Sequence, residues 1–283
     1  MMRRRMNRAL VACMAIPMMM TGQNVLDGVT VPERDESVTP YPYVREADMM
    51  WSKRVWRYVD LREKLNLPLA YPASNHPIKE RQNLFDVIHD AVLEGAVTAY
   101  EAYDGLYTSD EFTLPIGREQ LSVLGAGEND TIMVYYPEDD TERPKIISNP
   151  FDRSRVVMFK LKEDWYFDKK RSVMECRIIG IAPVIAEYSE SGEFLGLRDF
   201  YWVYFPELRP VLAQKKVFIR NNAVMPLSFD DVFVKRMFSS FIIKESNAYD
   251  RYIKEYKTGM DALLEGESVK HDIMDFEQDL WEY

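Results

Sequence analysis

Apolar residues repeat with a helical period in the first patterned part of the chain. Their spacing of i, i+4, i+7 and i+8 predicts an amphipathic helix over residues 46–66, and it comes from Trp51, Val55, Tyr58 and Val59. A second helix is predicted over residues 82–94, with Gly95 as its C-terminal cap. A short strand within 97–103 and a short helix within 115–124 are expected to follow.

The central part of the chain alternates apolar and polar residues, which is the period of a β-strand. Strands are predicted over 131–136, 155–167 and 172–182, with a polar turn at 168–171. In the second of these strands one parity is apolar: Val157, Phe159, Leu161, Trp165 and Phe167. The other parity predicts a solvent-facing side: Lys160, Lys162, Asp164 and Tyr166. The segment 160–183 is therefore interpreted as a hairpin with one wet face.

Two further features of the sequence concern the end of this hairpin and the segment that follows it. Gly180 and Pro183 are predicted to bend the chain or to end its pairing, since proline removes a donor from the ladder. The segment 199–205 is apolar on both faces, which predicts a strand that is central or covered on both sides.

The last third of the chain is predicted to be helical. Ser228 and Asp231 have the spacing of a capping box, and Phe229, Phe233, Met237 and Phe241 follow at steps of four. A second amphipathic stripe covers 249–264, Gly266 interrupts it, and a third covers 269–280. The predicted fold class is α+β, with a mostly antiparallel central sheet, flanking helices and a helical C-terminal third whose tail begins near residue 249.

The N-terminus is typical of an export signal. Residues 1–22 combine a basic start, a twelve-residue apolar stretch over 9–20 and small residues before a cleavage site between Gly22 and Gln23. Acylation of Cys13 as a lipoprotein is the alternative, but Cys13 lies inside the apolar stretch. Residues 23–45 contain three prolines without a strand or helix period, which predicts a flexible leader. Its "TPYPY" segment would otherwise dock on a partner as a polyproline strip. Residues 46–283 are expected to form one domain.

Charge and cysteine content narrow the class of protein. The formal net charge is −10, and because residues 1–22 hold four arginines and no acid, their removal leaves −14. Such a chain is poorly suited to bind nucleic acid or an anionic membrane surface. Beyond residue 20 no apolar run is long enough to span a bilayer. The chain without residues 1–22 holds only Cys176, so no intrachain disulfide is possible, and burial is expected for this thiol.

Catalytic and metal motifs are weak in this sequence. His76, His89 and His271 lie far apart, and the chain has no nucleophile elbow, phosphate-binding loop or dinucleotide fingerprint. We therefore predict no catalytic residue, no cofactor and no metal. The alternative left open is a hydrolase or ligand-binding module that uses the aromatic hairpin around Trp165.

The tail offers a different kind of site. From Glu245 onward there are eleven Asp or Glu against four Lys or Arg, interleaved with apolar stripes that need a surface to cover. The candidate partner interface comprises Tyr249, Tyr252, Ile253, Tyr256, Leu263, Ile273, Phe276 and Trp281. The alternative is that these stripes only wrap the second face of the sheet.

Several long stretches of the chain are informative together. They are "VREADMMWSKRVWRYVDLREKLN" (44–66), "LKEDWYFDKKRSVMECRIIGIAP" (161–183), "YFPELRPVLA" and "SFDDVFVKRMFSSFIIKESNAYDRYI" within 204–253, and the closing "GMDALLEGESVKHDIMDFEQDLWEY". These stretches resemble the GldN/PorN family of gliding-motility and type IX secretion proteins of Bacteroidetes. The resemblance covers the chain from about Val44 to its end.

The resemblance implies a periplasmic, non-catalytic building block of the secretion machinery, associated with the inner face of the outer membrane through its partners. Members of the family form a ring with an outer-membrane lipoprotein (GldK/PorK) and contact the periplasmic part of GldM/PorM. Self-association within the ring is expected, and no cofactor or catalytic residue is implied. The alternative from a different class is a periplasmic hydrolase or ligand-binding module.

Overall fold

A computed structural model describes residues 37–72, 81–104, 107–124, 130–136, 141–147, 151, 153–189, 191–217 and 227–280. Several predictions lie outside these residues. They are the export signal with its cleavage site at Gly22 and Gln23, the first part of the leader, and Trp281 of the candidate interface.

The strands of the described residues belong to one large sheet and two small ones. The large sheet contains β1 (Met49–Asp60), β2 (Ala99–Tyr100), β7 (Val156–Asp168), β8 (Val173–Tyr188), β9 (Phe194–Asp199), β10 (Trp202–Tyr204) and β11 (Phe241–Glu245). The small sheets are the pairs β3 (Tyr103–Asp104) with β4 (Tyr107–Thr108) and β5 (Asp130–Tyr136) with β6 (Thr141–Ile147).

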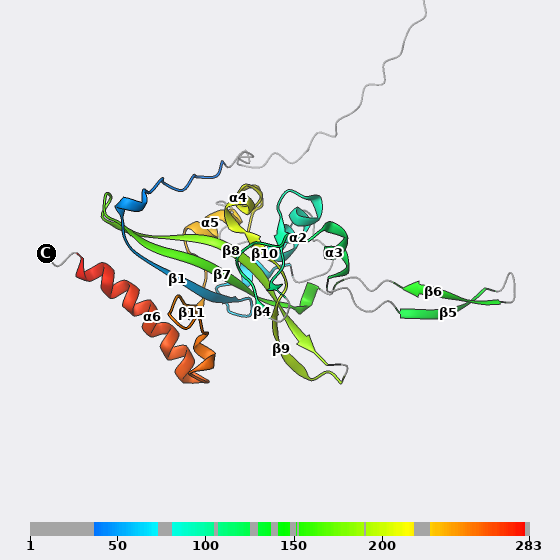
Figure 1. The fold of residues 1–283 in the computed structure, drawn as a ribbon. Coiled ribbons are helices and arrows are strands. Elements are labelled where there is room, and N and C mark those ends of the chain that lie inside the picture. Colours follow the sequence, from blue (N-terminus) through cyan, green and yellow to red (C-terminus); the bar gives the residue numbers. More distant parts are fainter. Residues whose placement is uncertain are drawn as a thin grey trace, which may run out of the picture. The chain divides into compact units, whose positions relative to one another are not determined.

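Short helices pack against the large sheet, and one long helix ends the described chain (Figure 1). The α-helices are α1 (Leu67–Ala70), α2 (Leu84–Glu94), α3 (Arg118–Val123), α4 (Phe205–Gln214), α5 (Phe229–Val234) and α6 (Met260–Asp279). Three single 3₁₀ turns are η1 (Glu46–Asp48), η2 (Arg153–Arg155) and η3 (Ile253–Glu255).

All pairings in the large sheet are antiparallel, in the order β11-β1-β7-β8-β10-β2, with β9 pairing the far end of β8. The centre is the long hairpin of β7 and β8, whose turn lies at Lys169–Ser172. The predicted α+β class with a mostly antiparallel sheet is confirmed.

Apolar clusters cover both faces of this sheet. Because side chains alternate along β1, Val55 and Val59 share one face and Trp56 lies on the other. The first face carries two clusters, one under α2, α4 and α5 that includes Val59, and one under α6 that includes Val55. The opposite face carries a smaller cluster around Trp56 and Trp202. We call these the helix-covered face and the loop-covered face.

The predicted helix over 46–66 is wrong, because β1 occupies Met49–Asp60 after the η1 turn. Trp51, Val55 and Val59 are four residues apart, and a spacing of four fits a strand as well as a helix because four is a multiple of two. Pairing with β7 on one side and β11 on the other decides between them. The rich content of valine and aromatic residues is also typical of strands.

The hairpin prediction is confirmed, but its limits are wrong. The return strand β8 continues through Gly180 and Pro183 to Tyr188. Pro183 lies opposite Phe159, and its carbonyl accepts a hydrogen bond from the amide of Phe200. A side chain at Gly180 would collide with Phe112, because an added Cβ would lie 2.4 Å from its ring. Both residues therefore mark close packing inside the sheet and not the end of a strand.

The predicted wet face is also wrong. Lys160 and Lys162 are buried beneath chain segments that are distant in sequence. Glu163, on the apolar parity of the same strand, is fully buried. These charged side chains form the two networks described below.

The prediction of a helical C-terminal third is only partly correct. The capping box of Ser228 and Asp231 is present, but α5 ends at Val234 and residues 241–245 form the edge strand β11. The tail becomes helical at Met260 and not near 249. Gly266 does not interrupt the helix: it faces the carbonyl oxygen of Ile242, which an added Cβ would approach to 2.6 Å. Glycine lets α6 pack directly on the backbone of β11.

Several local predictions are confirmed. Helix α2 ends at Gly95, which has the left-handed conformation of a C-cap (φ 76°), and α3 lies within 115–124. Residues 37–45 have no regular structure, as expected for the leader. Tyr41 nevertheless packs between the guanidinium groups of Arg177 and Arg209, with its ring centroid 5.5 and 4.4 Å away.

Candidate functional site

The helix-covered face contains a buried ionic cluster between its two apolar clusters. Glu163 on β7 pairs with Arg57 on β1 and with Arg236 after α5, each at 3.0 Å. The indole of Trp165 donates to the same carboxylate at 3.1 Å, and Arg57 donates to the hydroxyl of Ser240. A carboxylate with no exposed surface thus receives two cations and one neutral donor.

The geometry of this cluster depends on an unusual backbone position. Arg236 has a positive φ of 52°, a conformation that is uncommon outside glycine. Its guanidinium also contacts the sulfur of Cys176 and lies over the rings of Trp165 and Phe238. Strain at such a position persists only where the surrounding contacts hold it.

Burial and neighbouring charges together set the pKa values of Glu163 and Cys176. Burial alone would raise the pKa of Glu163, but the charges of Arg57 and Arg236 outweigh it and hold the pKa below its usual value. Burial, with the nearby Glu163 charge, raises the pKa of the Cys176 thiol well above its ordinary value. This thiol is therefore protonated and poorly suited to act as a nucleophile.

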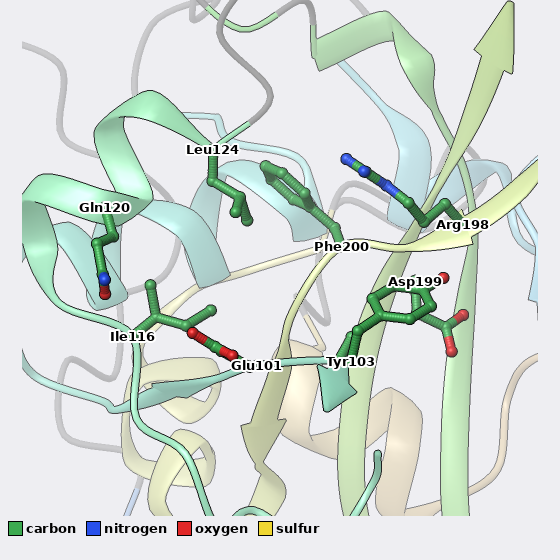
Figure 2. A pocket seen from close by; sticks show the side chains of 9 residues that line it. Glu101, Tyr103, Ile116, Gln120, Leu124, Arg198, Asp199 and Phe200 are labelled. Carbon is green, nitrogen blue, oxygen red and sulfur yellow. The ribbon is translucent and has the colours of Figure 1, made fainter. Parts of the chain in front are cut away.

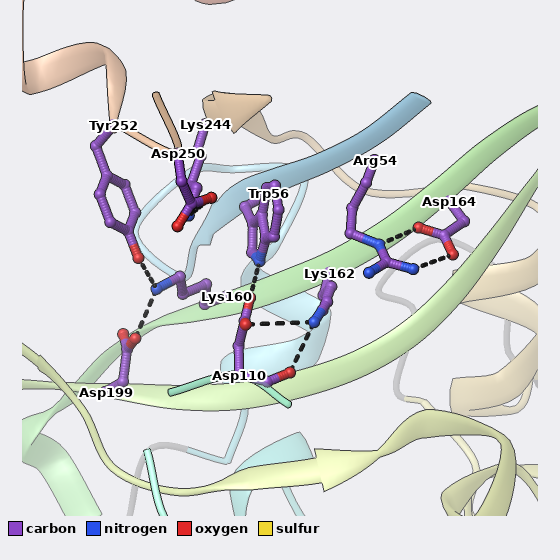
Figure 3. A network of polar contacts seen from close by, with 10 residues as sticks. All are labelled: Arg54, Trp56, Asp110, Lys160, Lys162, Asp164, Asp199, Lys244, Asp250 and Tyr252. Carbon is purple, nitrogen blue, oxygen red and sulfur yellow. Dashed lines mark hydrogen bonds and ion pairs between the residues drawn. The ribbon is translucent and has the colours of Figure 1, made fainter. Parts of the chain in front are cut away.

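The loop-covered face carries a row of lysines, each with its own acid (Figure 3). Lys160 contacts Asp199 at 2.6 Å and the hydroxyl of Tyr252 at 3.0 Å. Lys162 donates to the backbone carbonyl of Asp110 at 2.7 Å and pairs with its carboxylate at 3.3 Å.

A third lysine extends this row on the edge strand. Lys244 pairs with Asp250 at 2.7 Å. Its ammonium also lies 4.6 Å from the ring centroid of Trp56 and 5.0 Å from that of Tyr252. Figure 3 shows the row running from Tyr252 past Trp56 to the Arg54–Asp164 pair.

Two loops deliver Asp110 and Asp250, whereas Asp199 is the last residue of strand β9. The loop after β4 carries Asp110, which also accepts from the indole of Trp56, and Phe112, whose ring lies edge-on to Trp202. The loop after β11 carries Asp250 and Tyr252. Phe112 and Asp250 both have positive φ values, 56° and 49°. The network therefore closes the loops over the sheet.

Proton affinities in this network follow burial and pairing. Burial acts to lower the pKa of Lys160, but Asp199 together with Tyr252 and Tyr58 outweighs it and the pKa is raised. Burial lowers the pKa of Lys162, and Asp110 opposes this shift only in part. Both lysines are engaged with acids and tryptophan rings, so neither is arranged as a free base or nucleophile.

A cavity of about 360 Å³ lies beside this face, near the end of β9 (Figure 2). Its lining consists of Glu101, Ala102, Tyr103, Ile116, Gln120, Leu124, Arg198, Asp199 and Phe200. Arg198 is paired with Glu187, and Asp199 is paired with Lys160. Two of its charged groups are thus already engaged in ion pairs within the chain. Trp165, the centre of the alternative ligand-binding hypothesis, does not line this cavity.

The candidate interface residues of the tail fall into two groups. Ile253 and Ile273 are buried in the cluster under α6, Tyr256 packs against that cluster, and Phe276 stacks on Trp51. Tyr249 and Leu263 are exposed, and Tyr252 is half-buried in the lysine network. The structure thus places part of the predicted interface inside the chain's own core, as the alternative of wrapping the sheet expected. The interface itself remains a prediction.

Two further observations bear on chemistry. Among the described residues no group of three or more His, Cys, Asp or Glu is placed to hold a metal ion, and no helix is long and apolar enough to cross a membrane. His89 is buried, stacks on Phe85 and contacts the hydroxyl of Tyr201 at 3.3 Å. It is therefore a core residue of α2.

Sequence reasoning missed both ionic networks. The partners of Glu163 and of Lys162 come from strands and loops far away in sequence, and no spacing rule links them. One usable signal was the break in parity at Glu163, a charged residue among the apolar positions of β7. A charge on a buried face calls for a buried partner.

Comparison with known proteins identifies the family. The chain matches the family model described as "Gliding motility associated protein GldN" over residues 44–282. No curated protein matches it significantly. The family match covers every helix and strand described above, so it concerns the fold as a whole. The resemblance inferred from the sequence is therefore confirmed, and the chain belongs to the GldN family of gliding motility associated proteins.

Proposed function

We propose that this protein is a non-catalytic structural component of the type IX secretion and gliding machinery. In this proposal it is exported to the periplasm and forms a ring with a GldK/PorK-like outer-membrane lipoprotein. It also contacts the periplasmic part of a GldM/PorM-like protein. The observation that carries the proposal is the family match over residues 44–282.

The arrangement of charges supports a structural role. An enzyme needs titratable groups that reach a substrate, with a general acid or base free to exchange protons. Here Glu163, Lys160, Lys162 and Lys244 each bind another part of the same chain. These contacts join β1, β7, β11 and two loops into one body, which suits a building block.

Export is part of the proposal and can be tested alone. Intact-mass analysis of the protein from its native envelope should give an N-terminus at Gln23 and no lipid. A protein that begins at Cys13 and carries fatty acids would contradict cleavage after Gly22, and it would place the protein on the membrane by its own anchor.

The main test is a deletion strain complemented with a tagged copy. We expect loss of type IX cargo secretion in the deletion and co-purification of the lipoprotein with the tagged copy. The hydrolase alternative is tested by a Glu101→Gln variant in the same strain, since the Glu101 carboxyl group belongs to a residue that lines the cavity. Normal secretion with no lipoprotein recovered would overturn the structural proposal.

A further inference from the structure

The inner face of helix α6 packs against other parts of the same chain. Gly266, Val269 and Ile273 are buried, and Val269 and Ile273 pack with Val55, Ile242 and Ile253 in one cluster. This side of the helix is therefore core and is not available to a partner.

The outer face of the same helix exposes four large apolar side chains among polar ones. Met260 and Leu264 are 69% and 61% exposed, and Leu263 and Met274 are each 46% exposed. The seam Met260, Leu264, Glu267, His271, Met274 and Gln278 advances by alternating steps of four and three. That spacing keeps side chains on one line and is the spacing by which one helix packs along another.

The charge around this seam is predominantly negative. Seven Asp or Glu and one lysine lie within α6, and that lysine, Lys270, pairs with Glu267 of the same helix. The acids that flank the exposed leucines and methionines include Asp261, Asp272 and Asp275, all exposed. Exposed Leu and Met side chains interspersed with and bordered by acids are complementary to a helix that carries Leu or Met along one line and Lys or Arg beside it.

We propose that the outer face of α6 docks a basic amphipathic helix of another protein. This inference deepens the proposed function, because it assigns one partner contact of the assembly to a surface and names the chemistry of that partner. A second copy is a poor occupant, because the chain carries a net charge of −10 and its own tail is acidic. An anionic bilayer is disfavoured for the same reason.

The first experiment places a photo-cross-linking amino acid at Leu264 of the full-length protein in its native cells. The control carries the same group at Leu93, an exposed leucine on α2. We expect an adduct at position 264 whose cross-linked peptide, read by mass spectrometry, has an excess of Lys and Arg between apolar residues. An adduct with a second copy, with lipid, or with an acidic peptide overturns the proposal, as does an equal yield at position 93.

The second experiment tests the charge. The variant L264S/D275N keeps the inner face intact, and the control L93S/E94Q makes the same kind of change on α2. In this experiment the cross-linking amino acid is placed at Met274. The proposal predicts that L264S/D275N lowers the yield of the adduct by about tenfold, a change typical of losing a hot-spot contact. The control should leave it unchanged.

The two proposals fail in different ways. If the tagged wild-type chain recovers the lipoprotein but L264S/D275N gives wild-type adduct yield, the docking face is wrong and the proposed function stands. If the wild-type chain recovers no component of the machinery, the proposed function is wrong as well. Truncation at Gly266 would not separate these cases, because it removes Val269 and Ile273 from the core.

Discussion

The two faces of the central sheet use buried charge in different ways. On the helix-covered face a single acid, Glu163, holds two arginines and has no exposed surface. On the loop-covered face each lysine has its own aspartate, and one of these, Asp250, has 80% of its side chain exposed. The first cluster ties two apolar clusters together, whereas the second holds loops down. The lesson is that the cost of breaking an ion pair depends on how deeply the remaining charge is buried.

The largest effect is expected for Glu163→Ala. This change leaves Arg57 and Arg236 without their common acid in a buried site, and it should lower the free energy of unfolding by about 4–5 kcal/mol. Chemical denaturation of the purified protein measures it. A loss of unfolding free energy below about 1 kcal/mol would show that this cluster contributes no more than a surface ion pair. The two faces of the sheet would then not differ in how they use buried charge.

The pH dependence of this variant gives an independent check. The pKa of Glu163 is lowered in the folded protein, so its stabilisation is present above its unfolded value of about 4.3 and is lost as the pH falls through the folded pKa. The difference in stability between wild type and Glu163→Ala should therefore shrink below about pH 4. A constant difference would show that the carboxylate charge is not the cause.

The next effect is expected for Lys160→Met on the opposite face. Methionine keeps the apolar stem but leaves Asp199 buried without its cation, which should cost about 3 kcal/mol. The same denaturation experiment measures it. If Lys160→Met is as costly as Glu163→Ala, the loop-covered face is as much a part of the core as the helix-covered one.

The Trp165→Ala variant tests whether the hairpin of β7 and β8 is packed into the core through this ring. The ring lies under Arg236, borders the cluster under α6 and donates to Glu163, so its loss should cost about 3 kcal/mol. Thermal unfolding gives the measurement, with Lys170→Ala in the exposed turn as a control that should change stability by less than ~0.5 kcal/mol. An unchanged melting curve together with lost secretion would make Trp165 a partner contact.

The smallest effect is expected for Asp250→Asn. The pair with Lys244 is largely exposed on the acid side, so its loss should cost under ~1 kcal/mol. Proteolysis and hydrogen exchange of the loop after β11 should nevertheless increase, because the pair holds that loop near Trp56. No change in exchange would mean that Tyr252 and its hydrogen bond to Lys160 suffice to hold the loop.

Local chemistry in the sequence determined several features of this protein by itself. The capping box at Ser228, the C-cap at Gly95 and the turn between β7 and β8 depend on residues within one turn of chain, so short patterns predict them. The family also follows from the sequence, since long stretches of residues carry it. The candidate interface was predicted only in part, because apolar stripes mark a need for burial and not the surface that provides it.

Tertiary structure decided the remainder. The apolar residues of β1 fit a helix or a strand equally, and only the neighbouring strands β7 and β11 supply the hydrogen bonds that make it a strand. Lys160 and Lys162 lie 39 and 52 residues from the aspartates that neutralise them, so their burial could not be read from spacing. Likewise, the inner face of α6 is set by the packing of Gly266 on Ile242 and of Val269 and Ile273 in the cluster beneath the helix. A charge or an apolar side chain has no fixed place until distant segments meet around it, because burial is a property of the assembled fold and not of the local chain.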